Sequence, residues 1–166
     1  MSESTNPVVR IETSMGEIVL ELDAVNAPIS TANFVDYAND GFYEGTIFHR
    51  VIDGFMAQTG DVAHGDMEDG FNIRMAGTGG SELPNLPAEF SKLPHDRGTL
   101  GAARSASPDS ANSQFFINFK DNHFLNGQYT VYGRVIEGME LVDGITKGEP
   151  PAEPDRMISV KVAADA

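Results

Sequence analysis

The sequence predicts a mainly β protein, a closed eight-stranded antiparallel barrel capped by two α-helices. Short stretches in which apolar and polar residues alternate recur along most of the chain, and only two segments have helical spacing. Turn-forming residues separate these stretches, because the chain contains 17 glycines and 9 prolines. With 166 residues, 40% of them apolar, we expect one domain over residues 1–166, with residues 1–6 flexible.

Two alternating stretches near the N-terminus predict a β-hairpin. In residues 8–13 and 17–22, apolar side chains occupy every second position, so one face of each strand would be buried. Met15-Gly16 lies between them, at the place of the turn. We therefore expect an antiparallel pair that begins the sheet.

The two helices are expected over residues 28–40 and Glu137–Lys147. In both, apolar residues recur every three or four positions. Pro28 is a favourable first helical residue, and Gly41 and Gly148 are natural ends. The first helix would cover one end or face of the sheet.

The remaining strands are expected in five segments. Residues 61–98 between them are rich in glycine and proline and predict long, ordered loops. Thr46–Gly60 has the strand pattern, broken at Asp53-Gly54. The others are Gly98–Ala103, Ser113–Asn118, Tyr129–Val135 and Ile158–Val162.

Composition excludes several classes of function. The chain has 11 basic and 25 acidic residues and a net charge of −14, which argues against binding to nucleic acid or to an anionic membrane. It has no cysteine, so disulfides and thiolate chemistry are excluded. The first residues lack a secretory signal, and no apolar run approaches the roughly 18 residues of a membrane-spanning helix. We expect a cytoplasmic protein.

Three segments carry side chains suited to binding a peptide. Met56 and Gln58 are two residues apart, so they share one face of a strand, and Gln114 and Phe116 do the same on another. Side by side, such strands form a surface with an apolar floor and amide edges, with Arg50 as a cation at its rim. Phe55, Phe124 and Leu125 would complete a shallow pocket. The segments are Tyr43–Gly60, Ser113–Asn118 and Phe124–Gly127.

These segments, in this order, resemble the cyclophilin family of peptidyl-prolyl cis–trans isomerases, and the resemblance runs from about Val8 to Val162. It implies an enzyme that rotates Xaa-Pro bonds in proline-containing peptides and in unfolded or folding proteins, and so assists folding. It also implies a monomer that needs no cofactor and no metal. No nucleophile–base pair is apparent among the motif residues, and rotation about a C–N bond needs none.

The resemblance also implies roles for individual residues. Arg50 would be the catalytic residue, and Gln58 would orient it. The backbone at Arg104 would pair with the residue before proline, and Gly77–Gly80 resembles the family's glycine-rich loop. The substrate-binding residues would be Phe55, Met56, Gln58, Arg104, Ser105, Gln114, Phe116, Phe124, Leu125 and Tyr129.

The chain departs from many eukaryotic members at several of these positions. Phe124 stands where they have tryptophan, Tyr129 where they have histidine, and Arg104-Ser105 replaces an Asn-Ala pair. Because the missing indole N–H donates a hydrogen bond to cyclosporin, we expect that drug to bind weakly. Residues 62–76 form a longer segment than in minimal members, and no role is assigned to it.

Other interpretations remain open. Arg50 would be structural if it paired with a buried carboxylate, and Phe55, Met56 and Phe116 would be ordinary core residues if the strands faced inward. A protein with this surface would act as a binding module or chaperone if it gripped proline segments without important turnover. A donor aimed at the prolyl nitrogen favours the enzyme, since binding alone does not need one.

Overall fold

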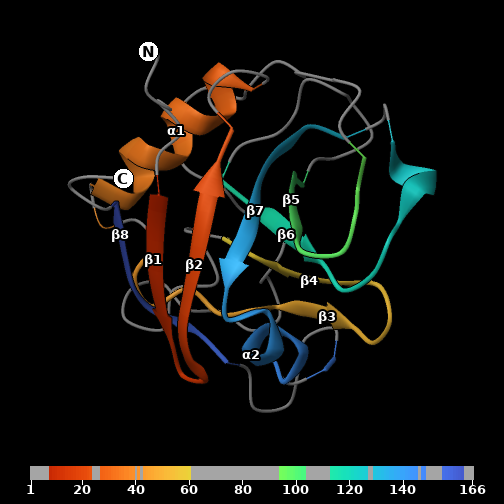
Figure 1. Cartoon of the computed structure of the whole chain (residues 1–166). Coiled ribbons are helices and arrows are strands. Elements are labelled where there is room, and N and C mark those ends of the chain that lie inside the picture. The colour runs from red at the N-terminus through yellow and green to blue at the C-terminus, as the bar shows by residue number, and fades with distance from the viewer. Residues whose placement is uncertain are drawn as a thin grey trace.

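The described part of the chain forms one curled antiparallel sheet of eight strands. One helix lies across the top of the curled sheet and the other below it (Figure 1). The structure is a computed structural model and describes residues 8–23, 27–39, 41, 43–60, 94–103, 113–126, 129–145, 147–148 and 155–162. Within these residues, none of the helices is both long and apolar enough to cross a bilayer.

The strands pair in an order that differs from their order in the sequence. Along the sheet they run β3-β4-β6-β5-β7-β2-β1-β8, and every pairing is antiparallel. The strands are β1 (Val8–Thr13), β2 (Gly16–Leu22), β3 (Arg50–Ile52), β4 (Met56–Thr59), β5 (Thr99–Ala102), β6 (Phe115–Asn118), β7 (Val131–Glu137) and β8 (Met157–Val162).

The sheet is curled, and its ladder ends at β3 and β8. The chain just before β3 approaches the start of β8 through a single bridge between Ile47 and Arg156. The Phe48 N–H donates to the Asp155 carbonyl at 2.8 Å, and the Met157 N–H donates to the Thr46 carbonyl at 2.9 Å. The mainly β prediction is confirmed. The closed barrel stays a prediction, because among the described residues no strand ladder joins the two edges.

The interior of the curled sheet is filled with large apolar side chains. Phe115 points inward from β6 and contacts Phe34 of α1 (Pro28–Asn39), with ring centroids 5.2 Å apart. Tyr43 lies 5.0 Å from Phe34, and its hydroxyl donates to the Ser113 carbonyl at 2.8 Å. All these rings are at most 1% exposed, so α1 closes one end of the core.

The second helix is shorter than the sequence predicts. α2 spans Met139–Asp143 rather than Glu137–Lys147. β7 continues to Glu137, and Gly138 then turns the chain with a φ of 90°, a conformation that glycine adopts without strain. The predicted hairpin and the helix near residues 28–40 are confirmed, with ends that differ by at most one residue.

Candidate active site

Three neighbouring strands carry a row of side chains on the outer face of the sheet. Gln58 on β4 lies directly opposite Arg50 on β3 and directly opposite Phe116 on β6. Residues directly opposite each other in a ladder project to the same face. Met56 is two residues from Gln58, so it projects to that face as well. The sequence predicted this shared face, and the strand order supplies the adjacency.

A cavity of about 110 Å³ opens above this row. Its floor is a small apolar cluster of Met56, Phe116 and Leu125, which are 2%, 5% and 8% exposed. This cluster is separate from the core inside the sheet. The cavity is lined by Arg50, Phe55, Met56, Gln58, Ala103, Phe116, Leu125 and Tyr129.

Seven of these eight lining residues were predicted from the sequence, and Ala103 was missed. Ala103 follows β5, and its N–H donates to the Gln114 carbonyl at 3.0 Å, which holds the end of β5 beside the cavity. An isolated alanine gives no signal in a sequence.

The amide side chains form the edge of the cavity. The Gln58 Nε2 donates to the Gln114 Oε1 at 2.8 Å, which fixes the orientation of both amides. Gln114 itself lines a second, smaller cavity beside Phe34 and Tyr43. It therefore lies next to the 110 Å³ cavity rather than within its wall.

Phe116 occupies space that only a glycine on the next strand leaves free. Gly101 lies opposite Phe116 in the β5–β6 ladder, and a Cβ atom there would stand 2.7 Å from the Phe116 Cε2. No unstrained structure contains so short a contact between carbon atoms. The ring therefore lies flat against the backbone of β5, and the cavity stays open above it.

The charge and chemistry of the lining are simple. Arg50, exposed at the rim, is the only ionised side chain among the described lining residues. None of these residues is a serine, cysteine, histidine or carboxylate, so they contain no nucleophile–base pair. Such a site can hold an apolar ring and offer hydrogen bonds from a guanidinium and from amides. It is not arranged to break a covalent bond.

The family model described as "Cyclophilin type peptidyl-prolyl cis-trans isomerase/CLD" matches residues 8–162. The chain belongs to the cyclophilin family. It is 53% identical over 155 residues to a "Probable peptidyl-prolyl cis-trans isomerase" of Brucella suis biovar 1, a match that covers 90% of this chain and 79% of the relative. Its activity is peptidyl-prolyl cis–trans isomerisation, as the family and its named relatives show.

Solved cyclophilin structures have the same fold. The crystal structure of a cyclophilin from Hirschia baltica matches with a TM-score of 0.83 at 27% identity, over 96% of this chain and 74% of that one. A Cryptosporidium parvum cyclophilin, crystallised in the presence of the dipeptide Ala-Pro, matches with a TM-score of 0.81 at 28% identity. That match covers 95% of this chain and 99% of the other.

Several predicted residues of the cyclophilin site lie outside the described structure. They are Arg104 and Ser105, the glycine-rich Gly77–Gly80 and the segment 62–76. Phe124 belongs to the short 3-10 helix η1 (His123–Leu125), but its side chain is also outside the described part. Their roles stay as the sequence predicts them.

A larger cavity of about 250 Å³ opens beside β2, β5 and β7, away from the motif segments. Its described lining includes Glu21 and Arg134, whose side chains form an ion pair at 3.0 Å, and it contains no aromatic ring and no amide side chain. The 110 Å³ cavity is therefore the candidate active site, because its described lining joins aromatic, amide and cationic groups from the motif segments.

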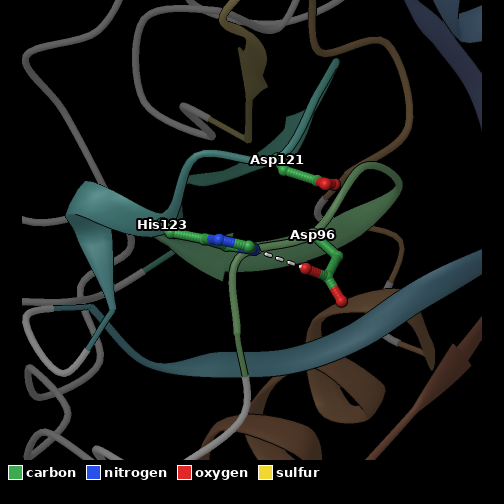
Figure 2. A group of neighbouring side chains, drawn as sticks. All are labelled: Asp96, Asp121 and His123. Carbon is green, nitrogen blue, oxygen red and sulfur yellow. Dashed lines mark hydrogen bonds and ion pairs between the residues drawn. The ribbon is translucent and has the colours of Figure 1, made fainter.

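One group of side chains in the described structure has donor atoms close enough for a metal (Figure 2). The ligand atoms of Asp96, Asp121 and His123 lie within 4.8 Å of one another. The His123 Nε2 pairs with the Asp96 Oδ1 at 2.7 Å, and the Asp121 Oδ1 accepts the Arg97 N–H at 2.9 Å. These bonds account for the grouping, so we assign no metal to it.

Proposed function

We propose that Xaa-Pro bonds rotate in the 110 Å³ cavity and that Arg50 is the catalytic residue. The observation that carries this proposal is the row formed by Arg50, Gln58 and Phe116 across β3, β4 and β6. It sets a guanidinium beside an apolar floor on which a proline ring can rest. Gln58, held by Gln114, would orient the guanidinium and the substrate carbonyl.

The reaction has a barrier of about 18–20 kcal/mol because the C–N bond has partial double-bond character. In the twisted transition state this resonance is lost, and the prolyl nitrogen becomes pyramidal and basic. An arginine N–H bonds that nitrogen better than the planar one, so it stabilises the transition state more than the ground state. A turnover near 10³ s⁻¹ requires roughly five decades of acceleration, or about 7 kcal/mol.

The cellular role is proposed from the same site. A cavity that binds one proline and its neighbours suits unfolded and folding chains, so we infer that the protein assists folding, as a monomer in the cytoplasm. Cell fractionation tests the cytoplasmic location, and sedimentation of the purified protein tests the monomeric state. Cyclosporin is expected to bind weakly because Phe124 has no indole N–H.

Exchange of a short Xaa-Pro peptide, followed by NMR or by a protease-coupled assay, tests the proposal. Arg50→Ala is expected to lower kcat/KM by about 10²-fold, if the lost donor contributes ~3 kcal/mol. Arg10→Ala removes the same charge from an exposed side chain that pairs with Glu17 on the hairpin, so it serves as the matched control. A chelator is expected to change nothing. Unchanged kcat/KM in Arg50→Ala overturns the assignment.

The binding-module alternative is separated by a refolding experiment. Catalytic amounts of an isomerase accelerate the refolding of a protein limited by proline isomerisation, whereas a binder acts only in stoichiometric amounts. We expect acceleration at low molar ratio by the natural chain and its loss in Arg50→Ala. Equal effects of the two proteins favour the chaperone instead.

A further inference from the structure

A histidine lies directly behind the candidate active site. The His95 side chain is 0% exposed, and its ring stacks on Phe116 with centroids 5.9 Å apart and planes 13° apart. It also meets the ring of Tyr129 edge-on at 6.4 Å. Phe116 belongs to the cavity floor and Tyr129 also lines the cavity, so one buried imidazole supports both the floor and a wall.

The backbone of His95 is held on both sides. Its N–H donates to the Asn126 Oδ1 at 2.7 Å, and its carbonyl accepts the Asn122 N–H at 2.7 Å. Both partners flank η1, which carries Leu125 of the cavity floor. These two bonds hold the backbone of His95 beside η1 and so place its side chain behind Phe116.

Hydrogen bonds fix which ring nitrogen of His95 carries the proton. The Asn118 Nδ2 donates to the Thr99 carbonyl at 3.3 Å and to the Thr99 Oγ1 at 2.9 Å, and a carbonyl oxygen can only accept. The same Nδ2 lies 3.4 Å from the His95 Nδ1, which must therefore be the acceptor. The Nε2 then carries the hydrogen and donates to the Tyr129 carbonyl at 3.3 Å.

This bonding continues to the opposite wall of the cavity. The Asn122 Nδ2 donates to the Asn118 Oδ1 at 2.8 Å and to the Phe55 carbonyl at 2.9 Å. Asn118 and Asn122 are both 0% exposed. Buried side chains thus connect the backbone of Phe55, on one wall, with the backbone of Tyr129 on another, and His95 is the member that also touches Phe116.

We propose that His95 is a positioning residue for prolyl isomerisation, which holds Phe116 and Tyr129 in place in its neutral, Nε2-protonated form. This inference rests on the proposed function of the cavity but adds a residue that none of the motifs contains. It also makes the shape of the cavity depend on one proton.

A second proton on His95 is incompatible with the surrounding bonds. It would sit on Nδ1 and face the N–H groups of Asn118. Reversal of the Asn118 amide would relieve this clash but would lose the bond to the Thr99 carbonyl and set two N–H groups of Asn118 and Asn122 against each other. Protonation therefore disturbs the bonds that reach Tyr129 and Phe55.

The electrostatic surroundings favour the neutral form. Burial lowers the pKa of His95 below 6.5; the bond to the Tyr129 carbonyl opposes this in part, and the nearby His123 adds to it. The other titratable or charged groups described on the elements around it are Asp96, Arg97, Lys120, Asp121 and Tyr129. His123 and Asp96 pair with each other, and Arg97 bonds Asp143.

Kinetics can separate this role from that of Arg50. The walls of the cavity hold the proline ring in the ground state and in the transition state alike, so their loss raises KM and leaves kcat nearly unchanged. The loss of Arg50 lowers kcat. A buried residue with a purely structural role would change the amount of folded protein and neither KM nor its dependence on pH.

The experiment measures kcat and KM between about pH 5 and 8 for the natural chain, His95→Gln, His95→Ala and His123→Gln. Glutamine reproduces the donor to Tyr129 and cannot titrate. We expect the KM of the natural chain to rise as pH falls through the NMR-determined pKa of His95, with kcat flat. His95→Gln should show a KM independent of pH, and His95→Ala a KM raised about three- to tenfold at pH 7.

His123→Gln is the matched control, because it removes an exposed histidine from the same region and should keep the rise in KM. A flat KM in the natural chain, or a rise that survives in His95→Gln, overturns the proposal. If His95→Ala does not fold, the natural chain and His95→Gln carry the test alone. If Arg50→Ala leaves kcat unchanged, the proposed function is wrong. If Arg50→Ala lowers kcat but the His95 variants leave KM and its dependence on pH unchanged, only this inference is wrong.

Discussion

The inner and outer faces of the curled sheet are made by the same strands but are filled differently. On β6, Phe115 and Ile117 point inward into a cluster of buried aromatic and aliphatic side chains. Phe116 and Asn118 point outward. There, Met56, Phe116 and Leu125 form a small cluster, Phe116 stacks on the buried His95, and a cavity of about 110 Å³ remains.

The difference shows how a small fold divides stability from function. Inside, apolar burial dominates, and each ring contributes to one core that holds all eight strands. Outside, hydrogen bonds fix a few aromatic rings in position and leave an opening between them. Substitutions on the inner face should therefore change unfolding, and those on the outer face should change catalysis.

The largest effect is expected from two neighbouring phenylalanines that point in opposite directions. Phe115→Ala removes a fully buried ring from the core and should lower the free energy of unfolding by about 3–5 kcal/mol. Phe116→Ala should cost less stability and raise KM, because it removes part of the cavity floor. Urea unfolding and peptide kinetics measure the two. Equal losses of stability in the two variants, with KM unchanged in Phe116→Ala, would contradict the assignment of stability to the inner face and catalysis to the outer face.

Gly101 offers a way to move the outer face without touching the inner one. The added Cβ of Gly101→Ala would push the Phe116 ring toward the cavity, at a cost of about 1–3 kcal/mol for overpacking, and KM should rise. The control is the same change made together with Phe116→Leu. If the ring transmits the effect, the second substitution should remove most of it. A KM effect of the same size in both backgrounds would exclude the ring.

Much of this fold follows from local pattern. The hairpin of residues 8–22 and the helix at Pro28 were predictable because period two and period 3.6 are visible within single segments. The length of α2 was not, because Gly138 ends β7 and leaves only five residues for the helix. The order of the strands was not predictable either, since pairs such as β4 and β6 join residues far apart in the sequence.

The candidate site also contains some residues that were predictable from the sequence and others that were not. Arg50, Met56 and Gln58 were predictable because they lie within one short motif. His95 was not, because its partners Asn118 and Asn122 come from another segment and a single histidine predicts nothing alone. One signal was available: Asn118 follows Phe116 by two residues, and a polar residue on the same face as a site aromatic indicates a buried partner.

Cyclosporin affinity tests the predicted role of Phe124, which rests on the sequence alone. Phe124→Trp restores the indole N–H and should strengthen inhibition by up to about one to two decades, equivalent to ~1–3 kcal/mol for a bond to a buried acceptor. Peptide turnover should change little. Inhibition of the natural chain that is already tight, with no gain in the variant, would contradict this.

The dependence of stability on pH should also differ between the faces. Burial raises the pKa of Tyr43 and Tyr132 in the core well above 10.0, so the unfolded chain loses their protons first and stability should fall above about pH 10. The lowered pKa of His95 means that the unfolded chain gains a proton first, so stability should fall as pH drops below about 6.5. Urea midpoints across pH measure both. His95→Gln should remove most of the loss between about pH 6.5 and 5, whereas the loss at lower pH, to which the lowered pKa of Asp143 contributes, should remain.

Arg50 is proposed to act on the transition state, and the floor and walls of the cavity are proposed to act on binding. The direct measurement is the exchange rate of an Xaa-Pro peptide at saturation, by NMR, together with its Kd, for the natural chain, Arg50→Ala and Phe116→Ala. We predict that Arg50→Ala slows exchange of the bound peptide by about 10²-fold with Kd changed only a few-fold, and that Phe116→Ala mainly weakens Kd. Exchange of the bound peptide at the natural rate in Arg50→Ala would show that Arg50 is not the catalytic residue.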